Sequence, residues 1–129
     1  MLVLDMDGSK PIYIQIAEWI ETSIIDSTLL PDAKVYSQYQ LAEIFNINPA
    51  TAGKGLTLLV DAELIYKRRG LGMFVSPDAR EKLLTKRKEE TLKRLVVELL
   101  KEADLLGVDE KHLLAIISKE RNKKKEGSS

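Results

Sequence analysis

Apolar residues recur at intervals of four near the start of the chain. This interval places side chains on one face of an α-helix, so the stretch is predicted to form an amphipathic helix of about four turns. Ser9 is placed to cap this helix, with Pro11 in its first turn, where the missing N–H group of proline costs nothing. The residues on the predicted apolar face are Ile12, Ile16, Ile20 and Ile24.

Two shorter helical patterns follow, with a tight turn between them. The first begins with a capping-box sequence, in which Ser37 is the N-cap and Gln40 is its partner. Asn46 is suited to end it, because asparagine tolerates the left-handed conformation. Asn48 is a favourable N-cap for the second helix, and Pro49 is a favourable first helical residue. A helix, a tight turn and a second helix form a helix-turn-helix.

Two apolar runs around a glycine-containing connection predict a β-hairpin after these helices. The runs lie at residues 64–68 and 73–75, and a very short strand is also predicted at Val35-Tyr36. Three helices followed by a basic hairpin have the order of a winged helix-turn-helix, so we expect a mainly α fold with a small β-hairpin wing. The positive charges at the tip of the hairpin are Lys67, Arg68 and Arg69.

The remainder of the chain has a helical pattern. Residues 79–106 form one long helical segment that Gly107 is placed to end, and Asp109 is placed to cap a further helix. The last residues are polar and charged, which is typical of disorder. The expected parts are a winged helix-turn-helix DNA-binding domain over residues 1–76, a helical dimerisation segment over 77–122 and a disordered tail over 123–129.

An apolar stripe on the two C-terminal helices needs a partner, because two such helices alone cannot enclose a core. A second copy of the same segment would bury both stripes in a symmetric four-helix bundle, and this is our preferred interpretation. The alternative is that the helices fold back onto the winged helix of their own chain. The stripe residues expected at the dimer interface are Leu92, Leu95, Val96, Leu99, Ala103, Leu106, Leu113, Ile116 and Ile117.

Charge is balanced over the whole chain but unequal along it. Residues 1–75 have six basic and nine acidic side chains, a net charge of −3, and residues 76–129 have fourteen and eleven, a net charge of +3. A nucleic-acid surface therefore has to rest on the local placement of positive charge. Four of the six basic residues of the first part, Lys54 and residues 67–69, lie on the helix after the turn and on the hairpin.

The composition argues against several classes of protein. The chain has no cysteine and one histidine, His112, which excludes disulfides and zinc sites built on thiolates. The carboxylates show no paired arrangement typical of acid–base catalysis. No uncharged apolar run approaches the roughly 18 residues of a membrane span. We expect a cytoplasmic protein that is not an enzyme and needs no cofactor, metal or membrane.

Four motifs occur together over residues 10–76. They are Pro-Ile-Tyr-x-Gln-Ile in the first helix, the serine before the second helix, Asn-Pro-x-Thr at the third helix and Arg-Gly-x-Gly-x-Phe-Val in the hairpin. Together they resemble the DNA-binding domain of GntR-type bacterial transcription regulators, and the short C-terminal segment is similar to the YtrA subfamily. The resemblance implies a homodimeric repressor that binds a two-fold operator in double-stranded DNA. It also implies phosphate contacts at the second helix, base contacts at the third and a minor-groove contact at the hairpin tip.

The chain departs from this family pattern at five positions. Tyr39 stands where an arginine is usual, and Ala50 stands where many relatives have asparagine or arginine, so two implied DNA contacts are changed. Tyr36 replaces a proline, and Asp32 and Glu63 replace glycines. The departures bear on affinity and sequence preference more than on the fold.

The candidate DNA contacts lie on the second helix, the third helix and the hairpin. Lys54, one turn after Ala50, is the first candidate for a base or phosphate contact. The alternatives are that Asn48 acts only as an N-cap, that the hairpin tip is a solvated surface and that its glycines serve only the turn. The full candidate set is Ser37, Gln38, Tyr39, Asn48, Ala50, Thr51, Lys54, Lys67, Arg68, Arg69, Gly70 and Gly72.

Two glycines interrupt the third helix, in the sequence INPATAGKGLTLL at residues 47–59. Each costs about 1 kcal/mol relative to alanine in a helix interior. We expect Gly53 to lie near the DNA-facing side, where it clears space and leaves Lys54 unobstructed, and Gly55 to ease contact with a neighbouring helix. A loose, adjustable helix is the alternative.

Two other functions are alternatives. A winged helix that binds protein and has lost DNA binding would fit Tyr39, Ala50 and the acidic balance of the first part. The other is a sensor of an unknown small-molecule effector, for which an apolar pocket at the dimer interface is the expected place.

Overall fold

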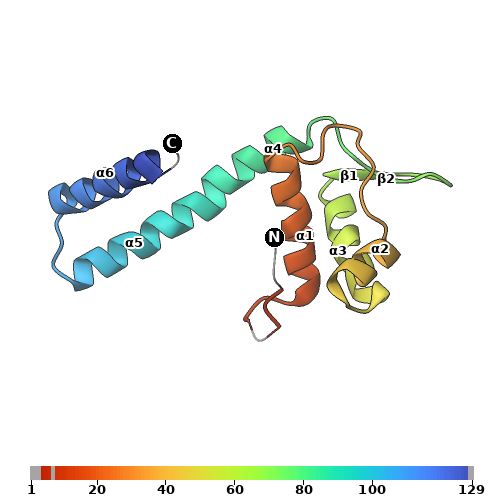
Figure 1. The fold of residues 1–129 in the computed structure, drawn as a ribbon, viewed down its shortest axis with the longest axis horizontal. Helices are drawn as coiled ribbons and strands as arrows, with labels where there is room; N and C mark the ends of the chain where they lie inside the picture. Colours follow the sequence, from red (N-terminus) through yellow and green to blue (C-terminus); the bar gives the residue numbers. More distant parts are fainter. Residues whose placement is uncertain (1–3, 7, 128–129) are drawn as a thin grey trace. The chain divides into compact units, whose positions relative to one another are not determined.

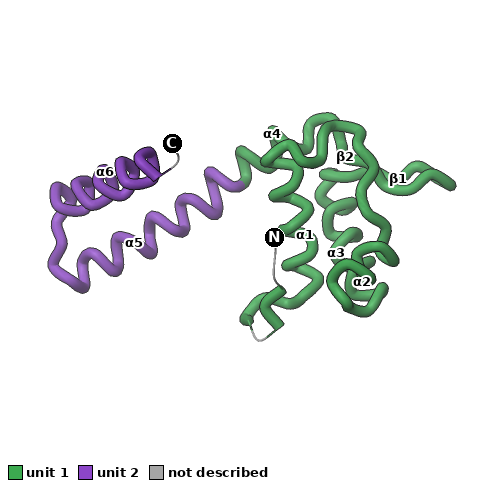
Figure 2. The backbone as a smooth tube through the Cα atoms, in the orientation of Figure 1, with its two compact units in different colours: residues 1–86 green, residues 87–129 purple. Residues whose placement is uncertain are grey.

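Helices make up most of the described chain, which comprises residues 4–6 and 8–127 of a computed structural model (Figure 1). The chain divides into two compact units, Met1–Lys86 and Arg87–Ser129 (Figure 2). The order of elements confirms the predicted winged helix-turn-helix followed by C-terminal helices. The elements are α1 (Ile12–Ile25), α2 (Gln38–Phe45), α3 (Pro49–Asp61), β1 (Ile65–Arg68), β2 (Gly72–Val75), α4 (Ala79–Lys86), the π-helical turn η1 (Arg87–Leu92), α5 (Lys93–Leu105) and α6 (Glu110–Gly127).

The core of the first unit includes the inner faces of α1, α3 and α4. Ile16, Ile20 and Ile24 are buried, as the interval of four predicts, whereas Ile12 is only partly buried. Full burial of one such side chain contributes about 1.5–3 kcal/mol, so the isoleucine face of α1 holds α3 in place. The buried residues that α3 and α4 add are Ala52, Gly55, Leu56, Leu59, Ala79 and Leu83.

The turn of the helix-turn-helix forms as its capping residues predict. Ser37 Oγ accepts a hydrogen bond from the Gln40 N–H (3.1 Å), and Gln40 Oε1 accepts one from the Ser37 N–H (2.9 Å). Asn46 ends α2 in the left-handed conformation, with a φ of 54°. Asn48 Oδ1 accepts a hydrogen bond from the Ala50 N–H (2.8 Å). These local bonds determine where α2 ends and where α3 begins.

The start of α1 differs from the prediction. The helix begins at Ile12, with Pro11 rather than Ser9 at its N-cap position. The Gln15 side chain donates hydrogen bonds to the carbonyl oxygens of Asp5 (2.8 Å) and Lys10 (3.0 Å). The segment before α1 is therefore tied to a residue inside the helix, and no side chain caps the helix end.

The hairpin of β1 and β2 is antiparallel, and its register leaves residues 69–71 as the connecting loop, which confirms the predicted wing. The strand predicted at Val35-Tyr36 is shifted by one residue. A bridge between Lys34 and Phe74 places the preceding segment beside β2, and the Val35 N–H donates to the Met73 carbonyl oxygen (2.8 Å).

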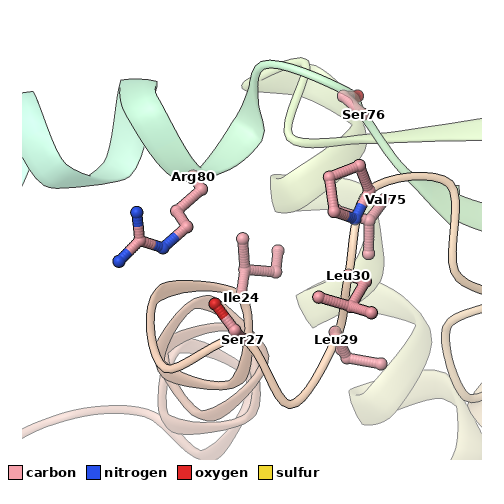
Figure 3. Close-up of a pocket in the computed structure, with 8 residues that line it drawn as sticks. Ile24, Ser27, Leu29, Leu30, Val75, Ser76 and Arg80 are labelled. Carbon is pink, nitrogen blue, oxygen red and sulfur yellow. The ribbon is translucent and has the colours of Figure 1, made fainter.

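Helix α4 belongs to the first unit, which continues past the boundary expected at residue 76. Ala79 and Leu83 are buried in the same core as α1. The Arg80 Nε donates a hydrogen bond to the Ile25 carbonyl oxygen at the end of α1 (3.0 Å), beside a small cavity of about 20 Å³ (Figure 3). Both contacts hold α4 against α1.

The second unit begins with a π-helical turn where one uninterrupted helix is predicted over residues 79–106. None of the six residues of η1 is buried. Gly107 follows α5 with a φ of 69°, which is the predicted stop. Asp109 caps α6 as predicted, because its Oδ1 accepts a hydrogen bond from the His112 N–H (2.9 Å).

The described part of the tail expected to be disordered over residues 123–129 is helical. Helix α6 continues through Gly127, and residues 128 and 129 lie outside the described residues. Lys123 Nζ lies 3.4 Å from Glu120 Oε1, and Lys124 and Lys125 lie in the last turn. Positive charge near a helix C-terminus complements the helix dipole, which favours continuation of the helix.

Two of the positions where glycine is usual in the family pattern adopt the left-handed conformation. Asp32 has a φ of 63° and Glu63 a φ of 59°. Asp32 gains a compensating bond, because its Oδ1 accepts from the Tyr66 hydroxyl (2.7 Å), and this bond raises the pKa of Tyr66. Glu63 gains only a distant ion pair with Lys82, at 3.9 Å.

Replacing Glu63 with glycine should therefore stabilise the protein. We expect Glu63→Gly to raise the free energy of unfolding by about 1 kcal/mol, because glycine adopts a positive φ without a steric cost. Urea denaturation followed by circular dichroism measures the change. Glu63→Ala is the control, since it removes the carboxylate and keeps the steric cost. An equal gain in both variants would contradict the conformational explanation.

Candidate nucleic-acid interface

A groove of about 470 Å³ lies between the start of α2 and the hairpin. It brings together candidate residues from two elements, and no acidic side chain lines it. Its lining also includes Lys34, which is not among the contacts predicted from the sequence. The position of Lys34 follows from its bridge to Phe74, and its positive charge is the only sequence signal for it. The lining residues are Lys34, Val35, Tyr36, Ser37, Gln38, Tyr39, Gln40, Leu56, Lys67, Gly72 and Met73.

The start of α3 presents its candidate residues unequally. Asn48 is exposed, but its side chain is used as the N-cap. Ala50 and Lys54 are exposed, whereas Thr51 is partly buried. Lys54 Nζ lies 4.1 Å from the centroid of the Tyr13 ring on α1. Lys54 is thus exposed and makes a cation–π contact with the Tyr13 ring of α1, a contact that the sequence did not predict.

The two glycines of α3 are each next to another helix. A Cβ atom at Gly55 would lie 2.7 Å from the Tyr13 carbonyl oxygen, which confirms that this glycine permits a close helix contact. A Cβ atom at Gly53 would lie 2.8 Å from Gln38 Oε1 of α2. The sequence predicted open space beside Gly53. In the structure the Gln38 side chain occupies this space.

The basic residues of the wing do not form one cluster. Successive side chains of a strand point to opposite faces, so Lys67 and Arg68 are separated by the hairpin. Lys67 lines the groove, while the Arg68 guanidinium carbon lies 5.6 Å from the centroid of the Phe74 ring. Arg69 is exposed in the loop.

The two glycines of the wing meet the requirements of the turn. Gly70 has a φ of 78° and Gly72 a φ of 115°, both of which glycine adopts far more readily than other residues. No heavy atom lies within 4 Å of a Cβ atom built at Gly70, so the loop backbone is open there. A close approach of this backbone to a DNA groove stays a prediction.

The apolar stripe of the second unit divides into buried and exposed residues. Ala103 and Leu113 are buried within the unit. The other stripe residues expose between 38% and 65% of their surface. No helix in the described ranges has the length and apolar character that a membrane crossing requires. The exposed stripe residues are Leu92, Leu95, Val96, Leu99, Leu106, Ile116 and Ile117.

Comparisons with known proteins give the family of the chain. No model of a known protein family matches it. It is 30% identical over 101 residues to the HTH-type transcriptional repressor YtrA of Bacillus subtilis (strain 168), covering 76% of this chain and 78% of that protein. A solved GntR family transcriptional regulator from Listeria monocytogenes is 30% identical with a TM-score of 0.73, covering 88% of this chain and 98% of that one. The chain belongs to the GntR family of transcriptional regulators.

Two further matches each cover a little over half of this chain. The chain is 39% identical over 74 residues to the HTH-type transcriptional repressor NagR of Bacillus subtilis (strain 168), which covers 57% of this chain but only 30% of that protein. The DNA-binding domain of AraR, solved in complex with the operator ORX1, is 30% identical with a TM-score of 0.53, covering 58% of this chain and 93% of that one. The predicted resemblance to GntR-type, YtrA-like regulators is confirmed by these matches.

The two glycines of α3 should respond differently to alanine. Gly55→Ala should lower the free energy of unfolding by about 1–2 kcal/mol, because overpacking against the Tyr13 carbonyl exceeds the gain of about 1 kcal/mol in helix propensity. Gly53→Ala should leave stability within about 1 kcal/mol of the wild type, because the flexible Gln38 amide can move aside. Urea denaturation of the two variants side by side measures the difference. Equal effects would refute the close contact at Gly55.

Proposed function

We propose that this GntR regulator is a homodimeric, sequence-specific DNA-binding repressor that acts on a two-fold operator in the cytoplasm. The observation that carries the proposal is the groove between α2 and the wing, whose lining contains Lys34, Lys67 and no acidic side chain. Residues 1–75 have a net charge of −3, so a groove free of acidic residues supports the binding of a polyanion at this place.

Each element has a separate part in the proposed contact. Residues 37–39 and Lys67 supply hydroxyl, amide and ammonium groups suited to backbone phosphates. The exposed Ala50 and Lys54 near the start of α3 are placed for the major groove, where this end of a recognition helix reads base edges. The operator complex of the related AraR domain supports DNA as the partner.

The dimer is supported by the exposed stripe of the second unit. Leu95 and Leu99 on α5 expose 47% and 42% of their surface, and Ile116 on α6 exposes 50%. A second copy presents the same surface, so a two-fold interface would remove both stripes from water. A two-fold dimer would place its recognition helices about one DNA turn apart, or a multiple of it.

Loss of two positive charges from the proposed surface should weaken DNA binding. Lys54→Ala combined with Arg68→Ala is expected to lower affinity for duplex DNA from upstream of the protein's own gene. The slope of log K against log salt concentration should decrease by up to about 2, since each phosphate contact contributes about 1. Fluorescence anisotropy over a salt series measures both quantities.

The matched control removes the same charge elsewhere. Lys111→Ala combined with Lys119→Ala changes two exposed lysines of α6 and should leave affinity and slope near the wild-type values. Thermal melting of both double variants checks that the fold is intact. If the two double variants bind equally well, the DNA-binding roles of Lys54 and Arg68 are refuted.

A charge in the stripe should dissociate the dimer. Leu99→Lys is expected to give a monomer in light scattering at micromolar concentration, whereas the wild type should have twice the chain mass of 14.5 kDa. The free energy gained by burying a leucine, about 1.5–3 kcal/mol per copy, would be replaced by the cost of burying an ammonium group.

Leu105→Lys is the control for this experiment. Leu105 is 79% exposed and lies off the stripe, so the same substitution there should leave the dimer intact. A monomeric wild type would contradict the proposed dimer directly.

A further inference from the structure

We propose that Lys34, on the segment that precedes α2, is a phosphate-binding residue that contacts DNA backbone beside the groove between α2 and the wing. This inference rests on the proposed DNA binding and adds a residue that precedes the helix-turn-helix. It makes the segment before α2 part of the interface.

Lys34 is held in a defined position by the backbone around it. It bridges Phe74 of β2 from the side opposite to β1. Its neighbours extend this pairing, because the Val35 N–H donates to the Met73 carbonyl oxygen (2.8 Å) and the Val75 N–H donates to the Ala33 carbonyl oxygen (2.9 Å). The segment therefore behaves as a short third strand, and Lys34 is fixed relative to the wing.

The side chain of Lys34 runs across Gly72. A Cβ atom at Gly72 would lie 3.0 Å from Lys34 Cε and 3.8 Å from Lys34 Nζ. A side chain at position 72 would thus crowd the lysine stem. Gly72 has a local role in this arrangement, because it leaves room for Lys34 to pass along the hairpin.

The two lysines that line the groove are not paired with acidic side chains. Lys34 and Lys67 both line it, and among the described residues neither has a carboxylate within ion-pair distance. The exposed hydroxyl-bearing side chains of Tyr36 and Tyr39 lie along the same groove. An anion with several acceptor oxygens satisfies ammonium and hydroxyl donors together, and a backbone phosphate is such an anion.

Lys34→Met tests the proposal, because methionine retains an unbranched stem across Gly72 and removes the charge. Affinity should fall by a similar factor for an upstream-region duplex and for a duplex of unrelated sequence, since a phosphate contact does not depend on sequence. The slope of log K against log salt concentration should decrease by about 1. The ratio of wild-type to variant affinity should shrink by about fourfold between 50 and 200 mM salt.

Two variants serve as controls. Lys34→Arg keeps the charge and should restore the slope, while Lys119→Met removes a lysine on α6 and should leave the slope unchanged. Thermal melting checks that each variant is folded. An unchanged slope in Lys34→Met, with normal binding by the wild type, would overturn this inference and leave the proposed function standing.

Two other outcomes distinguish a DNA phosphate from a free phosphate, and a failure of the Lys34 inference from a failure of the proposed function. A titration with inorganic phosphate, followed by NMR of backbone amides, should show no saturable binding at the groove. Saturable binding there, together with an unchanged DNA slope in Lys34→Met, would make the groove a site for a free anion and overturn the DNA assignment. A folded wild type that binds no duplex would overturn the proposed function itself.

Discussion

The arrangement of the first unit depends on one close contact between α1 and α3. The space that a Cβ atom would need at Gly55 is taken by the Tyr13 carbonyl oxygen, at 2.7 Å. A larger residue would move α3 away from α1 and open the core formed by the α1 isoleucines and the inner face of α3. The glycine costs about 1 kcal/mol of helix propensity, and the burial of Leu56 and Leu59 offsets this loss.

The same contact determines what α3 presents at its surface. Because Tyr13 lies beside Gly55, its ring is also within 4.1 Å of the Lys54 ammonium group. An exposed cation–π contact contributes about 0.5–1 kcal/mol, so Lys54 is oriented by the ring yet can exchange it for a phosphate at small cost. On the neighbouring side Gln38 lies next to Gly53, so both glycines bring α3 close to another helix.

Local organisation of charge matters more in this chain than its total. The first part is acidic overall, yet the groove beside α2 has two lysines and no carboxylate. Because side chains alternate along β1, Lys67 lies at the groove and Arg68 lies beside the Phe74 ring on the opposite face. In the second unit Ala103 and Leu113 are buried, while most residues of the predicted apolar stripe face solvent.

The sequence by itself determined the features that depend on neighbouring residues. The Ser37 capping box, the left-handed Asn46, the N-cap Asn48 and the presence of the hairpin depend on bonds within a few residues or one short loop, so the residue types suffice to predict them. The buried face of α1 was equally predictable, because the helical spacing of the apolar residues determines it. The extended α6 was missed because its charged residues are typical of both disorder and an exposed helix.

Only the tertiary structure decided which distant residues meet. The contact of Lys54 with Tyr13, the side chain beside Gly53 and the crossing of Gly72 by Lys34 each join segments that are far apart in the chain. Nothing in the local pattern encodes these pairs, because they follow from the packing of α1, α2 and α3 and from the strand pairing of residue 34 with β2. The sequence thus determined the elements and their faces, while the packing between them determined which side chains share the candidate interface.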